Sequence, residues 1–254
     1  MSSIESENVE FEGALGHKLA GRIYWPPDRK PLGFALFAHC FTCSKDLLGA
    51  VRIASTLAEK GWAVLSFDFT GLGESAGDFA DTNFSSNLDD LTGAADFLRQ
   101  KYEAPRLLFG HSLGGAAVIA AAERIPEATA VATIGAPCDP FHVAHLIEKQ
   151  APGLKGSEEA TVQLGGRPFL IKGQLLEDLA EQTQMKRLAN LGRALLVIHS
   201  PVDEIVGIEQ AKHIYDAARH PKSFVALDGA DHLIRRRKDS EWVGGILAAW
   251  ASRY

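Results

Sequence analysis

Residues 106–117 of the chain read Arg-Leu-Leu-Phe-Gly-His-Ser-Leu-Gly-Gly-Ala-Ala. The apolar run Arg106–Gly110 leads into a Gly-x-Ser-x-Gly pentapeptide, and a helical pattern rich in small residues follows over Leu113–Arg124. Such a pattern places a serine on a sharp, strained turn between a strand and a helix. The flanking glycines let the strand and the helix approach closely. The pattern predicts Ser112 as a nucleophile and the backbone N–H of Leu113 as a donor to an oxyanion.

The rest of the chain shows the alternation expected around such a turn. From residue 33 onward, short apolar runs alternate with amphipathic segments of helix length, which is typical of βαβ units and of a parallel sheet with helices on both faces. The predicted strands are Gly33–His39, Ala63–Phe67, Arg106–Gly110, Ala130–Ile134, Ala194–His199 and Ser223–Leu227. The predicted helices are Asp46–Lys60, Ser85–Tyr102, Leu113–Arg124, Ile208–Arg219 and Glu241–Ser252. An antiparallel hairpin, Val9–Glu12 with Lys18–Trp25, brings the sheet to eight strands within a single domain over residues 1–254.

One connection is much longer than a single helix requires. Residues 138–191 contain a helical pattern, a hairpin around Gly165-Gly166 and a second helical pattern; these are Phe141–Gln150, Thr161–Leu164 with Arg167–Ile171, and Gln174–Leu191. We predict an insertion at the edge of the sheet where α/β folds bind ligands. It is either a lid, with Phe141, Leu146 and Phe169 lining a substrate pocket for an acyl group, or an elaborated connection of which these side chains form the core.

A serine nucleophile needs a base and a group that orients the base. Where a serine occupies such a turn between a strand and a helix of a parallel sheet, the acid and then the histidine follow it in the chain. Asp203 comes just after the strand ending at His199, and His232 follows the last strand, so both are predicted at the edge where the Ser112 turn lies. Glu204 and Asp139 are the competing acids, and Asp231 is expected to shape the loop beside the base.

The loop after the strand Phe34–His39 is predicted to supply the second oxyanion donor, the backbone N–H of Phe41. This residue lies inside a Cys-x-x-Cys pattern, Cys40-Phe41-Thr42-Cys43. In thioredoxin-like proteins that pattern opens a helix and is redox active, but the context here is different. Two small buried residues are therefore the favoured interpretation, and a zinc site has no second Cys/His pair at a suitable spacing.

Over essentially its full length the chain resembles the α/β-hydrolases. The segments that carry the resemblance are His39-Cys40-Phe41, Asp68–Ser75, Gly110–Gly114, Asp203 and Gly229–His232. More narrowly, residues 39–46 and 134–137 are similar to the hydrolase half of bacterial two-domain proteins whose second half is OsmC-like, a family associated with organic hydroperoxide reduction. Cys40 departs from the wider family, which usually has glycine there. The resemblance leaves open whether the chain is free-standing or joined to an OsmC-like domain in a longer protein.

The resemblance implies a serine hydrolase that cleaves a carboxylic ester through an acyl-enzyme. Ser112 would attack the carbonyl, His232 would accept and return the proton, Asp203 would orient the ring, and Phe41 and Leu113 would hold the oxyanion. A perhydrolase with the same triad and a non-catalytic ligand-binding module on the same scaffold are the alternatives. No cofactor or metal is expected.

Composition restricts the remaining classes of function. The chain has 254 residues, 46% of them hydrophobic, with 26 basic and 32 acidic residues and a net charge of −6. Nucleic acid is an unfavourable partner, and Arg235–Lys238 is interpreted as the solvated start of a helix. The apolar runs are too short to span a membrane, the N-terminus lacks the pattern of a signal peptide, and three cysteines do not indicate a disulfide framework. We therefore expect a cytoplasmic protein whose partner is a small-molecule ester; its oligomeric state cannot be derived.

Overall fold

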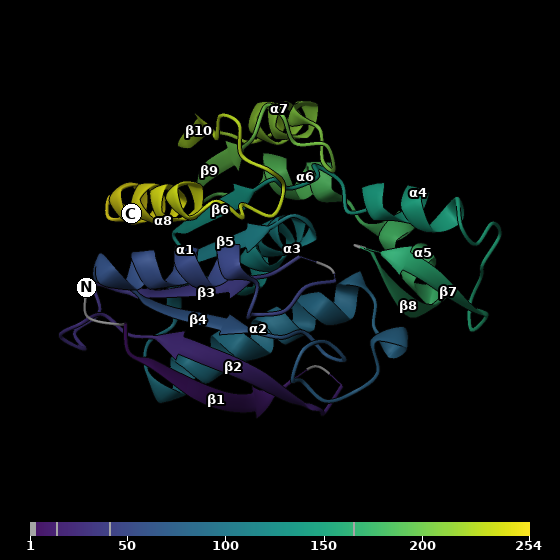
Figure 1. The fold of residues 1–254 in the computed structure, drawn as a ribbon, viewed down its shortest axis with the longest axis horizontal. Helices are drawn as coiled ribbons and strands as arrows, with labels where there is room; N and C mark the ends of the chain where they lie inside the picture. Colours follow the sequence, from purple (N-terminus) through teal and green to yellow (C-terminus); the bar gives the residue numbers. More distant parts are fainter. Residues whose placement is uncertain (1–3, 14, 41, 165) are drawn as a thin grey trace.

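An eight-stranded sheet forms the centre of the molecule, and the computed structural model describes residues 4–13, 15–40, 42–164 and 166–254 (Figure 1). The strand order is β1-β2-β4-β3-β5-β6-β9-β10. The strands are β1 (Ser6–Glu12), β2 (Lys18–Tyr24), β3 (Phe34–Ala38), β4 (Ala63–Phe67), β5 (Pro105–His111), β6 (Ala130–Ile134), β9 (Ala194–His199) and β10 (Lys222–Ala226). Only the pairs β1–β2 and β2–β4 are antiparallel; the neighbours from β4 to β10 are parallel. The α/β-hydrolase fold with a mostly parallel eight-stranded sheet is thus confirmed.

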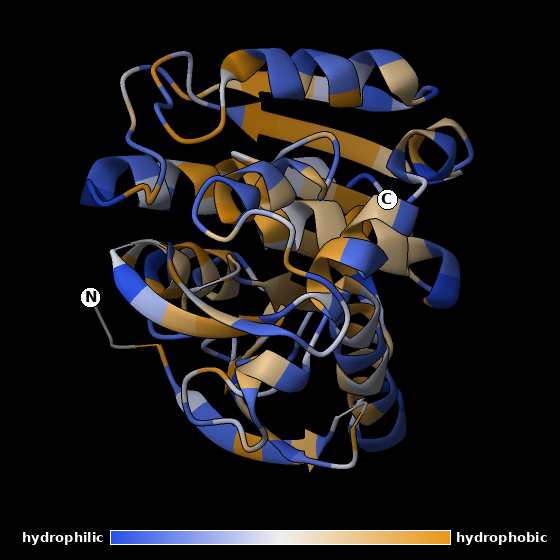
Figure 2. Cartoon of the chain, turned by 90° about the vertical axis from the view of Figure 1, so that its right-hand side faces the viewer, coloured by the Kyte–Doolittle hydropathy of each residue, from blue (hydrophilic) through white to orange (hydrophobic). Residues whose placement is uncertain are grey.

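Helices cover both faces of the sheet because its central strands are apolar on both sides. Along β3, Leu36 belongs to the core shared with α2 and α3, whereas Phe37 packs in the core shared with α1 and α8. These helices and their neighbours are α1 (Leu48–Glu59), α2 (Phe84–Lys101), α3 (Leu113–Ala121), α7 (Ile208–Ala217) and α8 (Arg237–Ala251), with short 3-10 helices η1 (Phe79–Asp81) and η2 (Ala122–Arg124). Figure 2 shows the apolar central strands between helices with hydrophilic outer sides. No helix in the described ranges is both long and apolar enough to cross a membrane.

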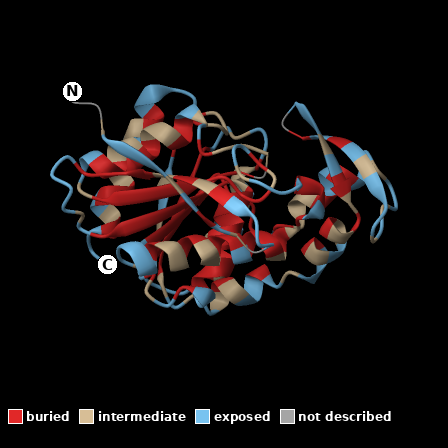
Figure 3. Ribbon diagram, turned by 90° about the horizontal axis from the view of Figure 1, so that it is seen from below, coloured by how far each residue is buried: buried red, intermediate tan, exposed pale blue. Residues whose placement is uncertain are grey.

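In the segment between β6 and β9, all elements but the last helix stand to one side of the sheet (Figure 1). It consists of α4 (His142–Glu148), the antiparallel pair β7 (Glu159–Leu164) and β8 (Arg167–Lys172), α5 (Gln174–Glu181) and α6 (Gln184–Ala189). Its hairpin is largely exposed, in contrast to the buried central strands (Figure 3). It contacts the main body through Phe169, which packs edge-to-face on Phe79 at 5.2 Å, and through Asp178, which accepts the N–H of Ser85 at 2.9 Å.

The sequence-based prediction of one helix over Gln174–Leu191 was wrong. The chain forms two helices, because Gln182 has extended backbone angles and ends α5. The break lets α6 turn onto α3, where the buried Gln184 donates its side-chain N–H to the carbonyl of Ala116 at 2.8 Å. A tertiary contact therefore outweighs the local helical pattern.

Candidate active site

Ser112 lies at the junction of β5 and α3 in a backbone conformation that few residues adopt. Its φ is +54° and its ψ is −127°. The strain persists because the surroundings hold it: the N–H of Ser112 donates to the carbonyl of Ile134 at 2.9 Å. Gly110 permits the tight turn, since a Cβ there would lie 2.2 Å from the carbonyl oxygen of Gly114, and Gly114 lets α3 approach β3, since a Cβ there would lie 2.3 Å from the carbonyl oxygen of Ala38. The turn predicted from the Gly-x-Ser-x-Gly pattern is present.

Asp203 lies in the acid loop, defined here as residues 200–207 after β9, and its side chain is 2% exposed. Its Oδ1 accepts the backbone N–H groups of Ile205 and Val206, both at 2.9 Å, and its Oδ2 is 2.8 Å from Nδ1 of His232. Burial disfavours the charged carboxylate, but the hydrogen bonds from His232, Val206 and Ile205 outweigh it and lower the pKa of Asp203. The carboxylate is thus kept ionised in a nearly closed environment.

His232 lies in the base loop, defined here as residues 227–234 after β10. Because the carboxylate of Asp203 accepts, the Nδ1 of His232 carries the hydrogen, and Nε2 is left as the basic nitrogen of the neutral ring. The side chain is 10% exposed, so part of the ring faces outward while the part that contacts Asp203 is covered. This tautomer is the one that a general base needs when it accepts a proton at Nε2.

Gly135 joins the pair to the serine turn. It directly follows Ile134, whose carbonyl holds Ser112, and a Cβ at Gly135 would lie 3.3 Å from Asp203 Oδ2 and 3.5 Å from His232 Nδ1. Its φ of +56° also favours glycine. In the described part of the chain no hydrogen bond joins the Ser112 hydroxyl to His232. The structure thus brings the loops of the three predicted residues together and bonds two of the three side chains.

The competing acids are placed elsewhere. Asp139 is exposed and accepts the N–H of Phe141 at 2.9 Å, in the turn that precedes α4. Glu204 is exposed, and Asp231 accepts the N–H of Arg235 at 2.9 Å and pairs with its guanidinium. Of the four carboxylates considered from the sequence, Asp203 alone is hydrogen-bonded to His232 among the described residues.

The predicted oxyanion donors are described only in part. Leu113 is buried and is the first residue of α3, so its N–H lies at the start of a helix. Phe41 lies outside the described residues. Its neighbours Cys40 and Cys43 form a disulfide, and Cys43 is half-buried, so the expectation of two independent buried thiols was wrong. The chain turns back after β3, with the N–H of Cys43 donating to the carbonyl of Cys40 at 3.1 Å, and this turn brings the two side chains together.

The three side chains predicted to line an acyl pocket differ in their surroundings. Phe141 is half-buried and packs edge-to-face on His145 at 5.2 Å. Leu146 is 42% exposed, whereas Phe169 packs on Phe79. Phe169 therefore also holds the insertion to the main body, and contact of any of the three with substrate stays a prediction.

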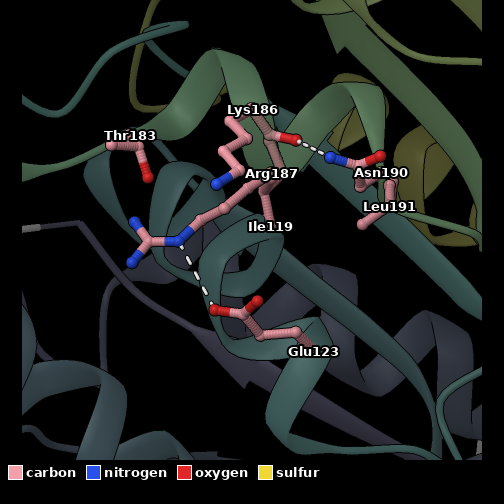
Figure 4. A pocket seen from close by; sticks show the side chains of 7 residues that line it. All are labelled: Ile119, Glu123, Thr183, Lys186, Arg187, Asn190 and Leu191. Carbon is pink, nitrogen blue, oxygen red and sulfur yellow. Dashed lines mark hydrogen bonds and ion pairs between the residues drawn. The ribbon is translucent and has the colours of Figure 1, made fainter.

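Two hollows differ in their relation to the site. One of about 880 Å³, including open solvent, lies between the acid loop and the base loop and is lined by His232 together with Val202, Ile205 and Leu233. The other, of about 570 Å³, lies between α3 and α6, and Figure 4 shows the Arg187 guanidinium paired with Glu123 beside it. Its lining residues Ile119, near the C-terminal end of α3, and Glu123, in η2, lie far along the chain from Ser112. The first hollow is the one that adjoins the candidate base.

A family model matches part of the chain, and similar proteins match almost all of it. The family model described as Hydrolase_4, serine aminopeptidase, S33, matches residues 44–159. A monoacylglycerol lipase of Mycolicibacterium smegmatis is 25% identical, over 98% of each chain. A crystal structure of the esterase domain of a Rhodothermus marinus protein is 52% identical over 99% of both chains, with a TM-score of 0.83. Est1E from Butyrivibrio proteoclasticus, with ferulic acid bound, shares the fold at 21% identity and a TM-score of 0.78, over 95% of this chain and 97% of that one.

Proposed function

The chain belongs to the α/β-hydrolase superfamily and resembles its esterases and lipases, and from this premise we propose that it is a serine hydrolase that cleaves carboxylic esters through an acyl-enzyme. The observation that carries the proposal is the 2.8 Å contact between His232 and Asp203, at the edge of the sheet where Ser112 occupies a strained turn. The 52% identical esterase domain supports the same chemistry.

In the proposed reaction His232 Nε2 accepts the Ser112 proton as Oγ attacks the ester carbonyl. The resulting imidazolium is stabilised by Asp203, whose lowered pKa keeps it charged. The Leu113 N–H, with the predicted Phe41 N–H, stabilises the oxyanion. The intermediate collapses when the C–O bond to the alcohol breaks and His232 returns the proton to the leaving oxygen. Water then attacks the acyl carbonyl while His232 accepts its proton. The bond between the acyl carbon and Ser112 Oγ breaks, and His232 returns the proton to Oγ, which releases the carboxylic acid and restores Ser112.

The proposal is tested by replacing the nucleophile. Ser112→Ala is expected to lower hydrolysis of p-nitrophenyl esters by about 10⁶-fold, the order seen when the serine of a cooperating triad is lost. The variant should also lose labelling by a fluorophosphonate probe while its melting temperature is retained. Ser252→Ala, at the exposed end of α8, is the matched control. Ester hydrolysis that survives Ser112→Ala would contradict the assignment.

Two narrower proposals go with this one. Assays of an acyl-chain series with and without hydrogen peroxide distinguish hydrolysis from perhydrolysis, because peroxide would replace water only in deacylation.

An OsmC-like domain joined to this one in a longer protein remains a proposal from the resemblance of residues 39–46. It is supported only in general by the 52% identical relative being described as a domain of a larger protein.

A further inference from the structure

Two buried histidines outside the proposed reaction make the same kind of contact. His111 is the last residue of β5 and is 4% exposed; His199 is the last residue of β9 and is 1% exposed. Nε2 of His111 lies 2.7 Å from the backbone carbonyl oxygen of His232, and Nε2 of His199 lies 2.8 Å from that of Val206. Because a carbonyl oxygen only accepts, each Nε2 carries the hydrogen.

The two carbonyl groups belong to the two loops that carry the base and the acid. His111 is adjacent to Ser112 in sequence, so its bond ties the nucleophile turn to the base loop; its ring also lies 4.8 Å from that of His232. His199 holds the residue whose N–H donates to Asp203, and its Nε2 is 3.7 Å from Asp203 Oδ2. The hydroxyl of Ser200 donates to the carbonyl of Ala230 at 2.7 Å and so links the two loops.

Both rings are suited to a fixed donor role rather than to proton transfer. The Nδ1 atoms of His111 and His199 are buried and have no hydrogen-bond partner among the described residues. A neutral ring has one hydrogen, and moving it to Nδ1 would leave the loop carbonyl without its donor. Burial, followed by the neighbouring His232, lowers the pKa of His111 to about 3, which keeps this ring neutral.

We propose that His111 and His199 are positioning residues that hold the base loop and the acid loop, through Nε2–H bonds to backbone carbonyls, in register with the Ser112 turn. The effect of the two histidines on catalysis rests on the proposed function, whereas their effect on the positions of the two loops does not depend on it. His111 acts on the ring that accepts the proton, and His199 acts on the carboxylate that orients that ring.

Kinetics of paired variants test the role of His111. His111→Leu removes the donor and retains bulk, whereas His111→Gln retains an N–H at a similar reach. We expect His111→Leu to lower kcat about 100-fold, the order produced by a displacement of about 1 Å, with KM little changed, and His111→Gln to recover most of the loss. Thr82→Val, which removes another buried donor to a carbonyl, controls for general loss of packing. Equal kcat values for His111→Leu and Thr82→Val would overturn the inference.

A double-mutant comparison tests His199. If His199 acts through Asp203, His199→Leu should lower kcat in the wild-type background and have little further effect in an Asp203→Asn background. Multiplicative losses would overturn its assigned route. His111→Leu, which acts on the base loop, should still lower kcat in the Asp203→Asn background.

Spectroscopy separates failure of this inference from failure of the proposed function. In protein with isotope-labelled histidine, the hydrogen on His232 Nδ1 should give a protected downfield proton signal. We expect it to exchange faster in His111→Leu and to be restored in His111→Gln. An unchanged signal in His111→Leu overturns the positioning role even if the wild type has no esterase activity. Loss and recovery of the signal support that role whatever reaction the site performs.

Discussion

Two histidine–aspartate pairs lie at strand ends on the same edge of the sheet, and they differ in what neutralises the carboxylate. Among the described residues, no lysine or arginine is hydrogen-bonded to the Asp203 carboxylate, which accepts a hydrogen bond from His232 Nδ1 at 2.8 Å. Asp68, just after β4, is fully buried and accepts the Lys45 ammonium at 2.8 Å and the Lys45 N–H at 2.6 Å. His39 remains 3.9 Å from Asp68.

The difference indicates what a carboxylate needs in order to orient a base. At Asp68 the permanent cation satisfies the charge, and His39 instead donates from Nδ1 to the carbonyl of Cys40 at 2.7 Å. Burial lowers the pKa of His39, which keeps that ring neutral. At Asp203 the place of the cation is taken by His232, which would become charged in the proposed reaction. The first pair is therefore structural, whereas the second gains stabilisation when a proton reaches its histidine.

Among changes to the two pairs, removing the acid of the second pair should give the largest effect. Asp203→Asn is expected to lower kcat about 10⁴-fold, as in the serine-protease precedent, because an amide can hold the His232 ring in the wrong tautomer. Ester turnover by purified, folded protein measures this. Asp139→Asn is the matched control and should remain close to wild type; a larger loss there would move the acid to the end of β6.

Removing the acid of the first pair should affect stability instead. Asp68→Asn leaves the buried Lys45 ammonium with the exposed Glu74 as its main partner, and we expect the free energy of unfolding to fall by about 3 kcal/mol, at the lower end of values for broken buried pairs. Chemical denaturation measures this. If kcat of the folded fraction fell as far as in Asp203→Asn, the distinction between the two pairs would be lost.

The buried neutral histidines should make stability depend on pH. His111 has a folded pKa of about 3, against about 6.5 in an unfolded chain. Between these values only the unfolded chain binds the proton, so the free energy of unfolding should be fully retained above about pH 6.5 and fall as pH decreases, by up to about 1.4 kcal/mol per pH unit for this group. Denaturation from about pH 4 to about pH 8 should give a flatter profile for His111→Gln. The exposed His213→Gln should leave the profile unchanged.

The smallest effects are expected in the insertion, where some side chains are exposed, whereas the carboxylates of both pairs are buried. Leu146→Ser removes a 42% exposed side chain and should alter acyl-chain preference with little change in melting temperature. Phe169→Ser breaks the contact with Phe79 and should lower the melting temperature. Profiles over a p-nitrophenyl ester series check the acyl-chain preference, and thermal denaturation checks the two melting temperatures. If neither Leu146→Ser nor Phe141→Ser changed the preference, the insertion would be a structural connection and not a substrate cover.

Much of the fold follows from short-range patterns, because burial on both faces requires continuous apolar strands. All eight predicted strands of the sheet are present, and seven of them end within one residue of their predicted bounds; β1 starts at Ser6 and not at Val9. Asp203 and His232 were predicted to be neighbours because the strands before them are parallel, and parallel strands bring their carboxyl ends to one edge of the sheet. The break at Gln182, the Cys40–Cys43 disulfide and the Lys45–Asp68 pair were not predicted.

The sequence by itself therefore determined the order of strands and helices along the chain and the serine turn, and it placed the candidate acid and base after strand ends, because each depends on residue type and on position along one element. The tertiary structure decided which histidine meets which carboxylate and which carbonyl. His39, His111, His199 and His232 all come at or just after strand ends, and no local pattern distinguishes a base from a donor to a loop carbonyl. That distinction depends on hydrogen-bond partners that are distant in sequence, and only the packed sheet brings those partners within reach.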